Sequence, residues 1–121
     1  MRAAAAGGRP RAPDGISSSA APRARRRYFA YLEKELATQP PGGALETVYF
    51  GGGTPSLVPP ELLKRFIRRL DETRGVSRDA EVTLECDPGT FDAAKLGAFV
   101  GAGVTRVSLG VQSFDDSILE A

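Results

Sequence analysis

The chain has 121 residues, a formal net charge of +1, 26% charged residues and 41% hydrophobic residues. These values are ordinary for a folded domain, and the sequence contains no run of about 18 apolar residues that could span a membrane. Histidine is absent, and the single cysteine is Cys86. The composition therefore excludes an internal disulfide framework and an ordinary His/Cys metal site, and we assign no metal ligand and no catalytic residue.

The near-neutral total conceals a basic amino-terminal segment. Residues 1–27 contain seven arginines and one acidic residue, Asp14, among many Ala, Ser, Pro and Gly residues. Such an arginine-rich, acid-poor segment is typical of a mitochondrial or chloroplast transit peptide. The alternatives are a disordered tail, with the protein in the cytoplasm, or non-native sequence from a wrongly assigned start of translation. We predict that residues 1–27 are disordered and that residues 28–121 form the domain.

Nucleic acid is not an expected partner of this segment. The arginines could attract a phosphate backbone, but no aromatic residue and no folded reading module accompany them.

From Tyr28 onward, amphipathic helical patterns alternate with short β-prone runs. We predict helices that begin near Tyr28, at Pro59 and Pro60, and after Thr90, which can act as the N-cap of the third. The strands are expected at residues 46–50, 81–86 and 105–111, and Asp115 and Asp116 are expected to start a further helix.

This alternation predicts an α/β fold with parallel strands. If consecutive strands are neighbours, right-handed crossovers place all the helices on one side of the sheet. The predicted architecture is therefore a partial (β/α) barrel of about three parallel strands. A doubly wound sheet is the alternative that periodicity alone does not exclude.

Side chains alternate between the two faces of a strand, which separates a helix-facing side from a polar side. Val82, Leu84 and Cys86 are expected to face the helices, as are Val107, Leu109 and Val111 in the third strand. Glu85 is expected on the opposite face, and Gln112 is expected at the end of the third strand. Ligands of barrels and open α/β sheets bind at the carboxyl ends of the strands.

The first strand ends in three consecutive glycines, Gly51, Gly52 and Gly53. The run lacks the lysine of a phosphate-binding P-loop and does not match G-x-G-x-x-G, so we do not expect it to bind phosphate. Its bare backbone can instead hold an amino-acid moiety, which needs both donors and acceptors. Together with Glu85 and Gln112 it predicts a site for a donor-rich or cationic ligand. The alternative for Glu85 is a simple ion pair with Arg106, or solvation at an edge.

Three segments carry a resemblance to a known family: VYFGGGTPSL, EVTLECDPGT and GVTRVSLGVQSFDD. They resemble the radical S-adenosylmethionine (SAM) proteins of the oxygen-independent coproporphyrinogen oxidase group, and most of all its heme-chaperone-like branch. The resemblance covers residues 28–121. It implies a partial radical SAM barrel.

The resemblance also implies roles for five residues. In the family, the glycine motif lies against the amino and carboxylate groups of SAM, which assigns that contact to Gly52, Gly53 and Thr54. The SAM-contacting glutamate and the glutamine of the later motifs match Glu85 and Gln112.

One departure from the family concerns the iron–sulfur cluster. The family's [4Fe–4S] cluster is bound by cysteines spaced C-x3-C-x2-C upstream of the helix at Tyr28, and this chain has arginine- and alanine-rich sequence there. Cys86 alone cannot hold a cluster that takes cysteine ligands from several positions. We therefore expect an incomplete piece of a radical SAM heme-pathway protein, without radical activity of its own.

The resemblance leaves several functions open. In the heme-chaperone branch the small-molecule partner is heme, and Ser113-Phe114 favours that branch. The alternatives are a coproporphyrinogen oxidase, whose substrate is a porphyrinogen, and a non-catalytic truncated or binding module.

Overall fold

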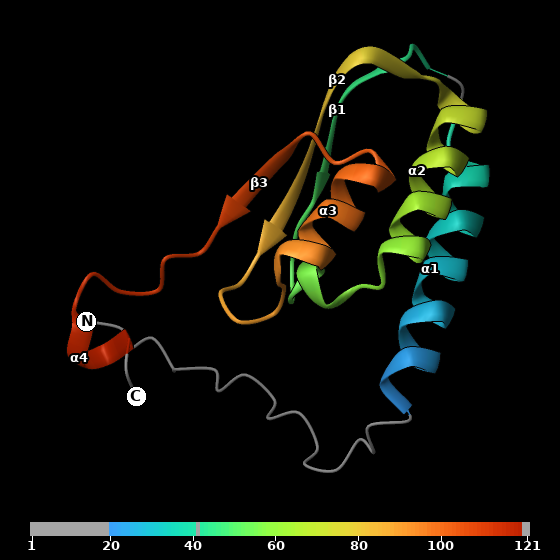
Figure 1. The fold of residues 1–121 in the computed structure, drawn as a ribbon. Coiled ribbons are helices and arrows are strands. Elements are labelled where there is room, and N and C mark those ends of the chain that lie inside the picture. The colour runs from blue at the N-terminus through green and yellow to red at the C-terminus, as the bar shows by residue number, and fades with distance from the viewer. Residues whose placement is uncertain (1–19, 41, 120–121) are drawn as a thin grey trace, which may run out of the picture.

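The computed structural model of the protein describes residues 20–40 and 42–119. A three-stranded parallel sheet is covered by helices (Figure 1). Along the chain the elements are α1 (Ala20–Thr38), β1 (Leu45–Phe50), the 3-10 turn η1 (Pro55–Leu57), α2 (Pro60–Arg74), β2 (Val76–Cys86), α3 (Ala93–Ala102), β3 (Arg106–Leu109) and α4 (Asp116–Leu119).

The sheet has the strand order β1-β2-β3, so consecutive strands are neighbours and β2 is central. Both pairs are parallel, as the alternation of strands and helices predicts. Phe50 lies opposite Leu84, and Cys86 lies opposite Leu109. The carboxyl ends of the three strands therefore lie at one edge.

All three long helices cover the same face of the sheet (Figure 1). Side chains from β2, α2, α3 and the turn before β3 form the main core cluster, which consists of Leu63, Val82, Leu84, Cys86, Phe99 and Val104. A second cluster joins α1 to α2 and to the same face of β1, and its buried members are Phe29, Leu62, Phe66 and Leu70. Helices on one side only are the mark of a barrel wall, which confirms the partial barrel over a doubly wound sheet.

Helix α1 begins at Ala20 rather than at Tyr28. Residues 20–27 are therefore helical where the sequence predicted a disordered tail, because Ala and Arg, which dominate this segment, are both strong helix formers. Its buried residue Phe29 packs edge-on against Phe66 of α2, with ring centroids 5.6 Å apart. The rest of the predicted tail, residues 1–19, lies outside the described residues, and its division from the domain stays a prediction.

The ends of the other helices follow their predicted signals with one correction. Gly75 ends α2 with a positive φ of 77°. Thr90 is not the N-cap of α3, because the side chain of Asp92 accepts a hydrogen bond from the backbone N–H of Lys95 at 2.8 Å. Thr90 instead donates its hydroxyl proton to the carbonyl oxygen of Asp87 at 2.6 Å.

Strand β3 departs from its predicted burial. The side chains of Val107 and Leu109 were expected to pack on the helices, but they are 37% and 52% exposed. The reason is positional: β3 is an edge strand of the sheet that the structure describes, and α3 covers β2 rather than β3. Within the described residues, no helix is long and apolar enough to cross a membrane.

Candidate functional site

The glycine run after β1 has two separate structural reasons. Gly52 and Gly53 have φ angles of 84° and 60°, a left-handed conformation that side-chain-bearing residues rarely adopt. Gly51 has no such angle, but a Cβ atom there would lie 2.6 Å from Cε1 of Tyr49 and 3.1 Å from Cδ of Glu85. Gly51 is therefore required by the close approach of the Tyr49 and Glu85 side chains, whereas Gly52 and Gly53 are required by the left-handed turn. A Cβ at Gly52 or Gly53 would meet no atom within 4 Å.

Glu85 lies beside this loop, on the face of β2 opposite the core residues Leu84 and Cys86. Its Oε1 accepts a hydrogen bond from the Tyr49 hydroxyl at 2.5 Å, and its Oε2 accepts one from the backbone N–H of Gly52 at 3.0 Å. One carboxylate thus joins the strand β1 to the glycine loop that follows it.

The alternative partner of Glu85 is engaged elsewhere. Arg106 on β3 forms its ion pair with Glu81, at 2.9 Å between Nη1 and Oε1. Glu81 is four positions before Glu85 on β2, so this pair lies further from the carboxyl-end edge. Glu85 is therefore neither the ion-pair partner of Arg106 nor a carboxylate without protein contacts.

These hydrogen bonds fix the ionisation of the site. The pKa of Glu85 is lowered below its ordinary value, mainly by the hydrogen bond from the Tyr49 hydroxyl and to a smaller extent by the one from the Gly52 N–H. Both donors favour the charged form of the carboxylate. The hydrogen bond to Glu85 is the main cause that raises the pKa of Tyr49. At neutral pH the site therefore presents a carboxylate beside a neutral phenol.

The other two predicted site residues occupy the same edge but are not joined to Glu85 by a hydrogen bond among the described residues. Thr54 precedes η1, and its side chain makes no capping hydrogen bond to that turn. Gln112 follows β3 with a positive φ of 67°, and its Nε2 lies 3.4 Å from the carbonyl oxygen of Gly110. The backbone N–H of Gly110 in turn donates to the carbonyl oxygen of Cys86, which places this segment at the end of β2.

Two contributions to the site were missed by the sequence analysis. One is Tyr49, which the sequence shows only as part of a β-prone run and which lies opposite Thr83, on the same face of the sheet as Glu85. Ser56 is completely buried, its hydroxyl lies 2.5 Å from that of Thr90, and its Oγ accepts from the backbone N–H of Asp87 at 3.2 Å. These contacts fasten the loop after β1 to the loop after β2, which holds the glycine loop in place.

The class of protein follows from comparison with known sequences. The radical SAM superfamily matches residues 11–121, so the chain belongs to this superfamily. The match covers both the strands and the glycine loop described above.

Relatives under three names match this chain. The heme chaperone HemW of Synechocystis is 44% identical over 93 residues, which cover 76% of this chain and 23% of that protein. The oxygen-independent coproporphyrinogen III oxidase of Cereibacter sphaeroides is 40% identical over 111 residues, which cover 88% of this chain and 24% of that protein. A mitochondrial radical S-adenosyl methionine domain-containing protein 1 of Bos taurus is 42% identical over 76 residues, 63% of this chain and 17% of that protein.

A solved structure agrees with the fold. Coproporphyrinogen III oxidase (HemN) from Escherichia coli, described as a radical SAM enzyme, matches with a TM-score of 0.73 and 26% identity. The match covers 82% of this chain and 24% of that protein. The chain thus spans about a quarter of the length of the relatives that it matches.

The superfamily implies SAM and a [4Fe–4S] cluster, and the described residues fit only the first. The open space over Gly52 and Gly53 and the carboxylate of Glu85 suit the amino-acid end of SAM. The cluster needs several cysteine ligands, whereas the chain has only Cys86, which is 1% exposed on the helix-facing side of β2. Burial raises the pKa of this thiol, as for a structural cysteine.

Proposed function

We propose that this chain provides the wall of a radical SAM protein that binds the methionine end of SAM. Glu85 accepts hydrogen bonds from the ammonium group of SAM. The carboxylate has room for this role because its two oxygens offer about four lone-pair positions, of which Tyr49 and the Gly52 N–H use two. This double anchoring is the observation that carries the proposal.

The glycine loop supplies the second part of the proposed contact. Gly52 and Gly53 leave space into which the methionine backbone fits, and Thr54 adds a hydroxyl at the end of the loop. Gln112 approaches the same ligand from the end of β3. In the family, bound SAM with a reduced cluster yields a 5′-deoxyadenosyl radical. We assign no radical step to this chain, because its single buried cysteine does not fit a cluster.

Isothermal titration calorimetry with SAM tests this proposal. Glu85→Gln removes the negative charge and is expected to weaken binding by about tenfold or more, since hydrogen bonds to a charged partner are about twice as strong as neutral ones. Glu81→Gln is the matched control, because Glu81 lies on the same face of β2 and pairs with Arg106 instead. Equal affinity of wild type and Glu85→Gln contradicts the role of Glu85, and no binding by wild type contradicts the proposed function.

For the physiological ligand we propose heme, as in the chaperone branch. Similarity to HemW and Ser113-Phe114 after Gln112 support this choice. The second candidate, an oxidase acting on a porphyrinogen, is supported by similarity to coproporphyrinogen III oxidases. Titration with heme, followed by its absorbance, is expected to saturate at one site, whereas tighter binding of coproporphyrinogen favours the oxidase.

We also propose import into a mitochondrion or chloroplast, directed by residues 1–27. The arginine-rich composition and the mitochondrial name of one relative support this. Fusing residues 1–27 to a fluorescent protein is expected to direct it to an organelle. A diffuse cytoplasmic signal favours the alternative location.

A further inference from the structure

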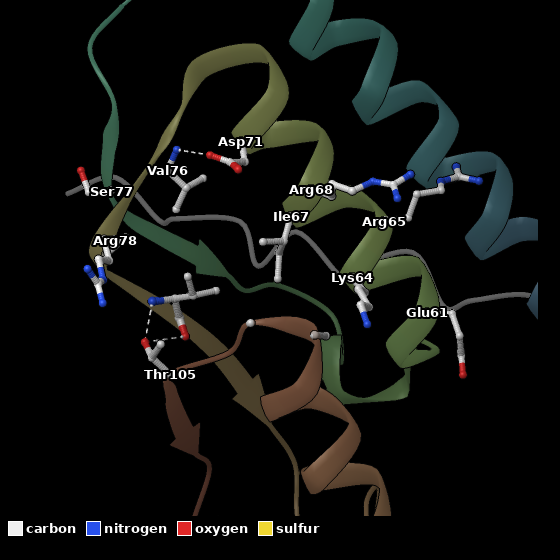
Figure 2. A pocket seen from close by; sticks show the side chains of 14 residues that line it. Glu61, Lys64, Arg65, Ile67, Arg68, Asp71, Val76, Ser77, Arg78 and Thr105 are labelled. Atoms are coloured by element: carbon white, nitrogen blue, oxygen red, sulfur yellow. Dashed lines mark hydrogen bonds between the residues drawn. The ribbon is translucent and has the colours of Figure 1, made fainter.

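A groove of about 630 Å³ lies along α2, between this helix and the amino-terminal half of β2 (Figure 2). The turn from α3 to β3 closes its third side with Gly103 and Thr105. The groove is on the helix-facing side of β2, where Ala80 and Val82 line it, whereas Glu85 and its contact with the glycine loop lie on the other face of this strand. It is therefore separate from the proposed SAM site.

The floor of the groove is apolar. Ala80, Val82 and Ala102 are buried there, with exposures of 7%, 3% and 7%. Ile67 projects from α2 into the groove (Figure 2) and lies 3.6 Å from the position that a Cβ of Gly103 would occupy. Because Gly103 has no side chain, the floor stays open to an apolar group from outside.

The rim of the groove is cationic. Lys64 projects from α2 and Arg78 projects from β2 on the other side, whereas Arg68 also lines the groove but extends from α2 toward α1 (Figure 2). Arg68 has an exposed ion pair with Glu72 at 3.5 Å. For Lys64 and Arg78, no ion pair is found within the part of the chain that the structure describes.

The acidic residues of the groove do not cancel these charges. The lining contains two acidic residues, Glu61 and Asp71, against four basic residues, and Asp71 is directed to the backbone N–H of Val76, from which it accepts a hydrogen bond at 2.8 Å. Glu61 lies in the first turn of α2, away from Arg78 on β2. The groove thus offers positive charge on two opposite sides of an apolar strip.

We propose that this groove is a docking site for an acidic segment of a partner protein, with carboxylates on the rim and an apolar side chain over Ile67. Charge complementarity on both sides of the groove would guide and orient such a segment. A nucleic acid fits less well, because single strands bind by stacking on aromatic side chains and the lining has none. Its phosphates would also leave the apolar floor unused.

The test is fluorescence anisotropy of the full chain with a short labelled peptide of glutamate and leucine. We expect saturable binding that weakens with added salt, because screening acts on the exposed cations. Replacing the leucines of the peptide by serine tests the floor without changing the protein, and replacing its glutamates by lysine tests the rim. Each replacement is expected to reduce binding by about tenfold or more.

Charge reversal in the protein distinguishes peptide binding in this groove from binding that depends only on the net charge of the chain. Lys64→Glu with Arg78→Glu is expected to weaken peptide binding by about tenfold or more. The matched control is Lys34→Glu with Arg69→Glu, which changes the net charge equally but leaves the groove lining intact. Circular dichroism shows whether both variants keep the fold.

Four outcomes of the peptide experiments overturn the proposal. They are no binding of the glutamate–leucine peptide, equal losses in the two double variants, equal binding of the serine peptide, and equal binding of the lysine peptide. The second outcome assigns the binding to net charge, including the arginines of residues 1–27. Tighter binding of a single-stranded oligonucleotide that is lost in the groove variant overturns the proposal in favour of a nucleic-acid groove.

Discussion

Two leucines on the same face of neighbouring strands are predicted to differ sharply in their contribution to stability. Leu84 on β2 is 0% exposed, whereas Leu109 on β3 is 52% exposed. Leu84→Ala removes three carbons, at about 0.8 kcal/mol each, so the transfer loss alone is about 2.4 kcal/mol. The cavity that remains brings the expected decrease in the free energy of unfolding to about 3–5 kcal/mol. Leu109→Ala loses about half of the transfer value, about 1.2 kcal/mol, and leaves no cavity because water fills the space.

Urea unfolding followed by circular dichroism measures both decreases, provided that the slope with denaturant is the same for all three proteins. For a domain of this size, about 1 kcal/mol corresponds to about 4–8 °C in melting temperature, so Leu84→Ala is expected to lower it by about 12 °C or more. Leu109→Ala is expected to lower it by about 5–10 °C. Equal decreases, or a larger one for Leu109→Ala, would refute the assignment of β3 as an edge strand with an open outer face.

Three further predictions concern the site and its neighbouring cysteine. The pKa of Glu85 is lowered in the fold, so its stabilisation is present above the unfolded pKa and is lost as the pH falls through the folded pKa. Tyr49→Phe removes the hydrogen bond that is the main cause of this lowered pKa, so the pKa of Glu85 should rise in a carboxyl NMR titration. An unchanged titration contradicts the hydrogen bond. Gly51→Ala should weaken SAM binding by about tenfold, because its Cβ displaces the Tyr49 ring, whereas Gly43→Ala, with no atom within 4 Å, should not. Cys86 should react slowly with iodoacetamide at pH 8 until the protein unfolds, and fast reaction in the native state contradicts its burial.

Much of the fold is predictable because its signals are local. Alternation within residues 81–86 separates the core residues Leu84 and Cys86 from Glu85, and the structure confirms this separation. Helix α2 ends at Gly75, because glycine tolerates the positive φ that this position adopts. These signals need only the period of the side chains and the conformation of single residues.

What the sequence does not predict depends on register and on neighbouring elements. The hydrogen bond between Tyr49 and Glu85 requires Tyr49 to lie opposite Thr83, which makes Glu85 its diagonal neighbour, and no local pattern gives that register. Thr90 and Asp92 are both good capping residues, and the contact of Thr90 with Ser56 determines which of them caps α3. The exposure of Leu109 likewise follows from which strand α3 covers.

The two proposed surfaces lie on opposite faces of β2, and this separation predicts that they act independently. From Arg78 to Glu85 the strand advances seven residues, about 23 Å at about 3.3 Å per residue. Substitutions this far apart with no shared partner are expected to have additive effects. Lys64→Glu with Arg78→Glu should therefore leave SAM affinity unchanged, and Glu85→Gln should leave peptide affinity unchanged. The strand β2 is central, and its helix-facing side chains between Arg78 and Glu85 are buried. A change in both affinities with an intact fold would therefore show that strain travels through this strand, and the two surfaces would then be coupled sites.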